Sequence, residues 1–237
     1  MRPSLLFLPG MMLDERAFTA QMSLLSQTVD VAVGDLSKGD CVEEIARNVL
    51  DKAPARFALA GLSMGGIIGF EIWRQASDRV THLALLDTTP HADRPERFQQ
   101  RLDQMAAVDK GQLGDVITTA MTPHYLAVKN RGNTALLEAI LDMGLSLGPQ
   151  VFRSQSMALM SRPDSLPLLS AIDCPVLVLC GRDDTLCTVA IHQLMADLIP
   201  SADLVVLAEC GHLSTLEEPT AVGRALEHLL TRIGARQ

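Results

Sequence analysis

Short apolar runs alternate with amphipathic stretches along most of the chain, and this pattern predicts strands and helices in turn. The apolar runs are rich in Val, Leu and Ala, as strands buried on both faces of a sheet are. The expected strands are 4–8, 28–33, 56–60, 80–87, 175–181 and 203–207. The expected helices are 15–25, 42–51, 64–75, 189–198 and 220–233. This order predicts an α/β fold with a mostly parallel, doubly wound sheet that carries helices on both faces.

The alternation breaks once, over residues 88–169, where only helical patterns occur. Prolines and glycines interrupt these patterns repeatedly, and the Gly148-Pro149 pair is the last such break. A stretch of this length is too long for a loop inside a compact domain. We therefore expect 1–87 and 170–237 to form the core, and 88–169 to be a helical insertion that covers the sheet as a lid.

The composition argues against several classes of protein. The chain has 237 residues, 48% of them hydrophobic, which fits one domain with a full core and excludes disorder. No run looks long and charge-free enough to span a bilayer, and the apolar N-terminus stops at Pro9-Gly10, as a first strand would. A net charge of −8 without a Lys/Arg cluster argues against nucleic-acid binding. We expect no membrane association either.

The chain has five cysteines, an odd number without metal-like spacing. This usage indicates free thiols in a reducing cytoplasm, without a metal site. Cys180 and Cys210 are expected to end neighbouring strands, and we expect both to stay buried thiols rather than form a disulfide.

The segment Gly61-Leu62-Ser63-Met64-Gly65 carries the clearest chemical signal. It follows an expected strand and precedes an expected helix, which is the context of the G-x-S-x-G turn that exposes a nucleophilic serine. The serine of such a turn has a strained backbone, so the positions two before and two after it must be small. Ser63 is therefore the candidate nucleophile.

A serine hydroxyl needs a base and an acid that orients the base. His212, in Cys210-Gly211-His212, is the one histidine that follows a strand and leads into a helix. Of the others, His82 begins a strand, His91 and His124 fall in the insertion, and His192 and His228 are expected on helix surfaces. Because functional groups gather at the carboxyl ends of parallel strands, His212 is the candidate base.

Three carboxylates follow strands and are candidates for the acid: Asp87, Asp183 and Asp184. We favour Asp184, with Asp183 capping its turn or pairing with Arg182, and Asp87 as a further contender. The mechanism also needs two backbone N–H groups that face the developing oxyanion. Met64, directly after the nucleophile, supplies one, and we expect Met11, in the turn Leu8-Pro9-Gly10-Met11, to supply the other.

These motifs together resemble the α/β-hydrolase fold superfamily, over essentially the whole chain. The resemblance rests on the Leu8-Pro9-Gly10 turn, segments 61–66 and 181–184, the 211–217 stretch with its Glu217, and the order Ser, Asp, His. In that superfamily the acid usually stands three residues after the glycine, which supports Asp184. Members often have a histidine where this chain has Pro9, and the backbone donor survives that change. Glu217 is expected near the N-terminus of the last helix.

The resemblance implies a carboxylesterase-like serine hydrolase that cleaves a small or medium acyl ester or thioester through an acyl-enzyme, without a cofactor or metal. Methionines of the insertion suit either a pliable acyl pocket or ordinary core; they are Met105, Met121, Met143, Met157 and Met160. Its arginines suit either solvated helix faces or an anionic substrate group; they are Arg94, Arg97, Arg101, Arg131, Arg153 and Arg162. Such a group would be a carboxylate, a coenzyme A phosphate or an acyl-carrier protein.

Two other functions keep the same residues. Relatives with this fold and triad perform lyase chemistry or cleave C–C bonds, and others are non-catalytic modules that bind small molecules. Ester turnover with a covalent acyl-serine favours hydrolysis, and failure to label Ser63 with a fluorophosphonate favours a binding module. The sequence does not define the oligomeric state.

Overall fold

The computed structural model describes residues 2–232, and their apolar runs form one six-stranded sheet in which all neighbours are parallel. The strands are Ser4–Leu8 (β1), Asp30–Val33 (β2), Phe57–Leu62 (β3), Val80–Leu86 (β4), Val176–Gly181 (β5) and Ala202–Leu207 (β6). They lie in the order β2-β1-β3-β4-β5-β6. The chain therefore winds outward from β1 in both directions, as the expected doubly wound sheet requires.

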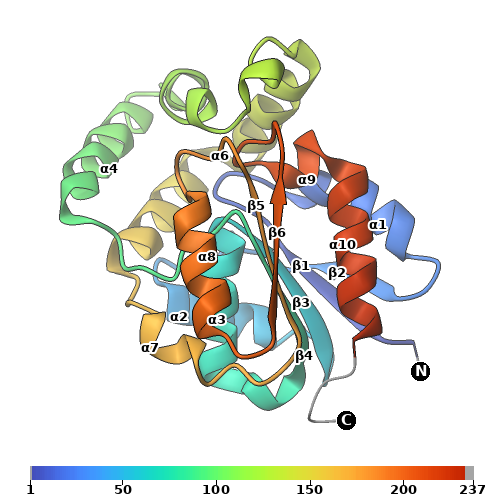
Figure 1. Cartoon of the computed structure of the whole chain (residues 1–237). Coiled ribbons are helices and arrows are strands. Elements are labelled where there is room, and N and C mark those ends of the chain that lie inside the picture. Colours follow the sequence, from blue (N-terminus) through green and yellow to red (C-terminus); the bar gives the residue numbers. More distant parts are fainter. Residues whose placement is uncertain (1, 233–237) are drawn as a thin grey trace.

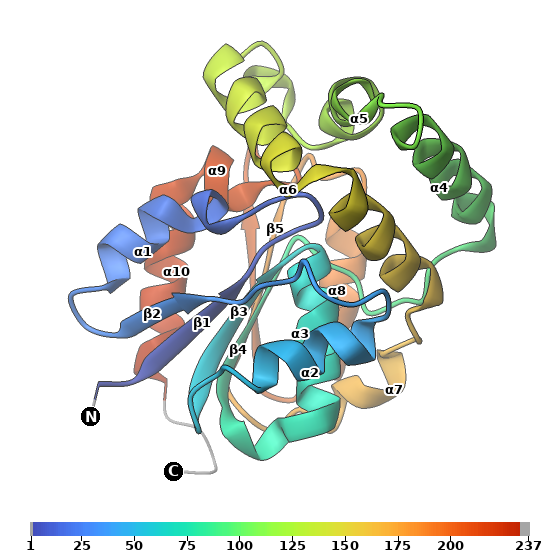
Figure 2. The ribbon, with the colours of Figure 1, turned by 180° about the vertical axis from the view of Figure 1, so that it is seen from behind.

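Helices cover both faces of the sheet (Figures 1 and 2). Thr19–Leu25 (α1) and Pro219–Thr231 (α10) lie on one face, and Val42–Leu50 (α2), Met64–Ala76 (α3) and Val189–Leu198 (α8) on the other. Successive strand residues point to opposite faces. Thus Leu5 and Phe7 belong to the core under α1 and α10, whereas Leu6 and Leu8 belong to the core under α2, α3 and α8.

Several element boundaries differ from the expected ones for local reasons. β2 begins at Asp30 because the N–H groups of Thr28 and Val29 donate to Leu25 O and close the preceding turn. β4 ends at Leu86, since Asp87 has a φ of +46°. The first expected helix is a 3₁₀ turn, Glu15–Phe18, followed by α1. Residue 233, the expected end of the last helix, lies outside the described residues.

The chain between β4 and β5 is helical, as expected, and no strand occurs in 88–169. Its α-helices are Pro95–Val108 (α4), Leu113–Asp115 (α5), Thr134–Ser161 (α6) and Leu166–Leu169 (α7), with a π-helical turn Val116–Met121 and short 3₁₀ turns between α5 and α6. Figures 1 and 2 show α4, α5 and α6 beyond the carboxyl ends of the strands. This segment therefore stands over the edge of the sheet where functional groups gather.

One helix corrects the expectation drawn from hydropathy. By length and composition α6 is apolar enough to cross a membrane, alone among the described helices. However, Gly148 has a φ of +81° and Pro149 follows it, so the helix is kinked there. Neither half reaches the roughly 20 residues of a membrane span. The apolar side chains of α6, such as Ile140 and Phe152, instead join the protein core.

Candidate active site

Ser63 lies at the tip of the turn between β3 and α3, with a φ of 53° and a ψ of −112°. Its N–H donates to Leu86 O over 2.8 Å, which ties the turn to the neighbouring strand β4. A side chain at Gly65 would place its Cβ 2.0 Å from Leu8 O, so only glycine fits there. The approach of the α3 backbone to β1 therefore requires the glycine at 65. The glycine at 61 is required by the turn itself, since a Cβ there would lie 2.4 Å from the backbone of Gly65.

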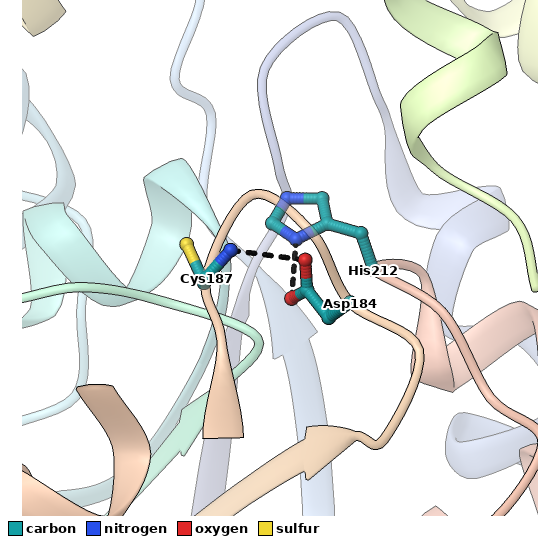
Figure 3. A group of neighbouring side chains, drawn as sticks. All are labelled: Asp184, Cys187 and His212. Atoms are coloured by element: carbon teal, nitrogen blue, oxygen red, sulfur yellow. Dashed lines mark hydrogen bonds and ion pairs between the residues drawn. The ribbon is translucent and has the colours of Figure 1, made fainter. Parts of the chain in front are cut away.

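His212 lies 28 residues after Asp184 and 149 residues after Ser63, and two hydrogen bonds join the three side chains. The Ser63 Oγ lies 2.8 Å from His212 Nε2, and His212 Nδ1 lies 2.8 Å from Asp184 Oδ2. Because a carboxylate only accepts, Nδ1 carries the proton and Nε2 is free to accept the serine proton. Figure 3 shows the carboxylate of Asp184 below the imidazole.

The other two candidate acids have different contacts. Asp183 is exposed, and its N–H donates to Cys210 O. Asp87 is fully buried, and its carboxylate accepts from the N–H groups of Gly181 and Ser214, both over 3.1 Å. Asp87 therefore ties the end of β5 to the loop that follows His212, whereas Asp184 contacts the imidazole itself.

Backbone amides hold the carboxylate of Asp184 in place. Asp184 Oδ1 accepts from Leu186 N over 2.8 Å. It also accepts from Cys187 N over 2.9 Å (Figure 3). The ligand atoms of Asp184, Cys187 and His212 lie within 4.8 Å of one another, a spacing that suits a metal ion. However, His212 Nδ1 and both carboxylate oxygens of Asp184 are already used in hydrogen bonds, and burial with the charges of Asp184 and Asp87 raises the pKa of the Cys187 thiol. The cluster fits the orientation of the imidazole better.

Met11 and Met64, the expected oxyanion donors, lie on the same side of the site. Both line one pocket with Ser63 and His212. A Cβ on Gly10 would lie 3.5 Å from the Cβ of Ser63, so the turn that carries Met11 touches Ser63. The next residue, Met12, has a φ of 58° and donates its N–H to Gln155 Oε1 over 2.9 Å. Buried Gln155, which the sequence analysis did not single out, thus holds this turn from α6.

The pocket above these residues has a volume of about 680 Å³. Of the methionines in the 88–169 segment, Met121 lines it, whereas Met105 and Met143 are buried in the core and Met157 is exposed. The arginines divide more clearly. Those lining the pocket are Arg94, Arg97, Arg101 and Arg162. Arg131 instead donates to Leu126 O, and Arg153 pairs with Asp109.

A model of the alpha/beta hydrolase family matches residues 5–225, nearly the whole chain. The chain belongs to the alpha/beta hydrolase family. An esterase from Thermogutta terrifontis, solved with malate bound, superposes with a TM-score of 0.88 and 28% identity over 96% of this chain and 89% of that one.

Two curated relatives also act on ester bonds by name. The pimeloyl-[acyl-carrier protein] methyl ester esterase of Nitrosomonas europaea is 24% identical over 92% of this chain and 91% of its own. The 3-oxoadipate enol-lactonase 2 of Acinetobacter baylyi is 27% identical over 73% of this chain and 62% of its own. These similarities support a hydrolase that acts on ester bonds.

Within this hydrolase, the charges around the imidazole set its proton affinity. Burial by itself lowers the pKa of His212, but the charge and hydrogen bond of Asp184, with the charge of Asp87, outweigh burial and raise it. Burial, together with the charge of Asp184, raises the pKa of Asp87 to about 7. The site therefore favours the protonated imidazole, the form that a base reaches after it accepts a proton.

His192 corrects the sequence analysis, which expected it on a helix surface. It is fully buried; its Nδ1 donates to Thr188 O and its Nε2 accepts from Thr88 N, both over 3.0 Å. Thr88 Oγ1 in turn donates to Ser63 O over 2.7 Å. Burial lowers the pKa of His192, so it stays neutral and can accept at Nε2. Nothing in the local sequence indicates this contact, because Thr88 lies 104 residues away.

Glu217 stands two residues before α10, as expected, and its carboxylate accepts hydrogen bonds from two separate parts of the chain. Oε1 accepts from Gly211 N over 2.8 Å, and Oε2 accepts from Ala127 N over 2.8 Å and Asn130 Nδ2 over 2.9 Å. His212 N also donates to Tyr125 O over 2.7 Å, and the two rings stack with centroids 5.7 Å apart. These hydrogen bonds join the 88–169 segment to the loop that carries His212, which we call the histidine loop.

Each cysteine of the chain is a free thiol, as expected. Cys180 and Cys210 are both buried, and burial raises the pKa of the Cys180 thiol to about 12. Neither thiol is suited to act as a nucleophile, since the thiolate is the reactive form.

Proposed function

We propose that this chain is a serine hydrolase in which Ser63 is the nucleophile, His212 the base and Asp184 the acid that orients the base. The observation that carries the proposal is the continuous hydrogen-bond chain Asp184–His212–Ser63, which opens onto a pocket of about 680 Å³. This chain of donors and acceptors is what activates a serine hydroxyl at neutral pH.

The reaction follows from these positions. Ser63 Oγ attacks the acyl carbon while its proton passes to His212 Nε2, and the oxyanion accepts from the N–H groups of Met11 and Met64. Neither of these two amides has an acceptor among residues 2–232, so both are available to the substrate. His212 returns the proton to the leaving alcohol or thiol, which departs. Water, deprotonated by the same imidazole, then attacks the acyl-enzyme. The acyl–Oγ bond breaks, the acid is released, and His212 Nε2 returns the proton to Ser63 Oγ.

We further propose a small or medium acyl substrate, as an ester or as a thioester, and a lid function for residues 88–169. The esterase of Nitrosomonas europaea acts, by its name, on a methyl ester linked to an acyl-carrier protein. That similarity supports a substrate that is either a free small molecule or a carrier-linked acyl group. The position of α4, α5 and α6 over the carboxyl ends of the strands supports the lid (Figure 2).

The test is hydrolysis of p-nitrophenyl esters from acetyl to dodecanoyl by the wild type and by Ser63→Ala. We expect a maximum at one acyl length and loss of activity in the variant. Labelling of Ser63 by a fluorophosphonate is measured in parallel. Labelling without ester turnover would overturn the ester assignment in favour of lyase or C–C bond chemistry. Absence of both would overturn the catalytic assignment in favour of a binding module.

A further inference from the structure

Three arginines and one aspartate form a cluster on the wall of the pocket; they are Arg97, Arg101, Arg162 and Asp93, and we call them the arginine cluster. Arg101 Nε lies 2.6 Å from Asp93 Oδ2, and Arg162 Nη2 lies 3.1 Å from Asp93 Oδ1. Asp93, Arg101 and Arg162 are each buried to all but 7%. A single carboxylate thus faces three guanidinium groups, which leaves an excess of positive charge.

The three arginines of the arginine cluster differ in how many of their N–H donors are already used by the protein. Arg162 is used by the protein: it forms an ion pair with Asp93 and donates hydrogen bonds to His91 O and Leu159 O. Arg101 gives one edge to Asp93, and its Nη1 lies 3.9 Å from the Sδ of Met11. Arg97 lies half-buried on the first turn of α4, and its guanidinium has no hydrogen bond or ion pair with any residue of the range 2–232. Its planar donor fork is therefore open toward the pocket.

Stability of the protein does not explain this arrangement. Arg97 and Arg101 are four residues apart on one helix, a spacing at which like charges repel. The first turn of a helix favours acidic rather than basic side chains, yet Arg94 and Arg97 occupy the start of α4. Burial and the charge of Arg101 lower the pKa of Arg97, which reports the cost of holding this cation unpaired. An anionic ligand would offset the repulsion between the two arginines and the burial of an unpaired cation.

The arginine cluster lies near the reacting atoms. Arg97 and Arg101 line the same pocket as Ser63 and His212, and the charge of Arg97 acts on the pKa values of both Tyr125 and His212. Tyr125 stacks on the imidazole. Arg101 contacts Met11, the residue whose amide is the second oxyanion donor. A group bound by Arg97 therefore belongs to the same substrate molecule that presents its acyl carbon to Ser63.

We propose that Arg97, supported by Arg101, binds a carboxylate carried by the substrate, so that the preferred substrates are half-esters or thioesters of dicarboxylic acids. This inference rests on the proposed ester hydrolase function and names its substrate class. The guanidinium fork donates two parallel hydrogen bonds to a carboxylate, which fixes the orientation of the substrate and selects for its negative charge. A phosphate of a carrier arm shares this anionic chemistry, and the experiment separates the two sources.

The test compares 4-nitrophenyl half-esters of succinate, glutarate and adipate with the same compounds in which the free carboxylate is capped as a methyl ester. The measured quantity is the ratio of kcat/KM for the charged substrate to that for its capped partner. In Arg97→Gln this ratio is expected to fall about 10- to 100-fold, mainly through KM, since a hydrogen-bonded charge pair is lost. Arg153→Gln, a control on α6 whose partner Asp109 lies outside the pocket lining, should leave the ratio unchanged.

The outcomes separate the inference from the function on which it rests. Turnover of capped esters with the same ratio in wild type and Arg97→Gln would overturn the carboxylate site and leave the hydrolase intact. If Arg97→Gln instead lowered only the preference for butyryl-coenzyme A over butyryl-N-acetylcysteamine, the anion would be a carrier phosphate and the carboxylate assignment would be wrong.

Binding is measured without turnover as well, by calorimetric titration of glutarate into Ser63→Ala and Ser63→Ala/Arg97→Gln. Binding by the first variant and at least tenfold weaker binding by the second supports the site even if every ester assay is silent. Equal affinity in the two variants overturns it. Because the guanidinium of Arg97 has no hydrogen bond or ion pair within the described residues and is repelled by Arg101, its replacement should not lower Tm. A large fall in Tm would show that Arg97 has a structural role instead.

Discussion

Replacing Glu217 with Gln tests how the histidine loop is held in place. The carboxylate accepts three N–H groups from two separate parts of the chain: Gly211, which precedes the base, and Ala127 and Asn130 in the segment above it. Gly211 has no room for a side chain, since a Cβ would lie 2.6 Å from Ala127 N. The loop and the segment are therefore in direct backbone contact, and Glu217 is the acceptor that satisfies both.

The loss of stability expected in Glu217→Gln follows from the number of hydrogen-bond acceptors that the glutamine retains. Gln keeps one oxygen, which can serve Gly211, but its amide then faces Ala127 N–H donor to donor. Asn130 can turn its side chain and accept from Gln, whereas the buried Ala127 N–H stays unpaired at a cost of about 1–3 kcal/mol. Loss of the charge weakens the Gly211 bond by about 1 kcal/mol more. A total of about 2–4 kcal/mol corresponds to a fall in Tm of roughly 5–15 °C for a chain of this size.

The assay is thermal unfolding of Glu217→Gln with Glu218→Gln as its matched control, together with kcat on the best p-nitrophenyl ester. Among the described residues, the side chain of Glu218 pairs with Lys129 alone, over 2.6 Å at the surface, and such pairs contribute about 0–1 kcal/mol. We also expect a lower kcat in Glu217→Gln, because displacement of Gly211 moves His212 relative to Ser63. Equal Tm values for the two variants would refute this account of Glu217.

Three further predictions concern the nucleophile, the acid and the base. Gly65→Ala should unfold the protein or destabilise it by more than about 3 kcal/mol, because its Cβ would meet Leu8 O at 2.0 Å, whereas Gly69→Ala, whose nearest contact is 3.5 Å, should fold normally by circular dichroism. Asp184→Asn should lower kcat by about 10⁴-fold through the wrong imidazole tautomer, and exposed Asp183→Asn should change it little. The base acts in its neutral form, and its pKa is raised above 6.5, so kcat/KM should rise with pH to a plateau with a midpoint above 6.5. A midpoint below 6.5 would contradict the influence of Asp184 and Asp87 on His212.

The sequence by itself determined the architecture, because the burial of a strand and the amphipathicity of a helix depend on the pattern of residues that are neighbours in the chain. Its alternation predicted the parallel sheet, which the structure confirms to within a few residues at each element end. It also placed Ser63, Asp184 and His212 directly after strands, at positions that a parallel sheet brings to one edge. The structure brings these three together, and their catalytic roles remain a prediction.

What the sequence left open depended on contacts between residues far apart in the chain. It named Asp87 and Asp184 as rival acids, and only the tertiary structure shows Asp184 against the imidazole and Asp87 bonded to Gly181 and Ser214. It placed His192 on a surface, although the residue is buried against Thr88. It did not separate the arginines of the pocket from those of the surface. Periodicity shows which face of a helix is apolar, but only packing decides what a polar side chain meets, since its partner is chosen by the whole fold.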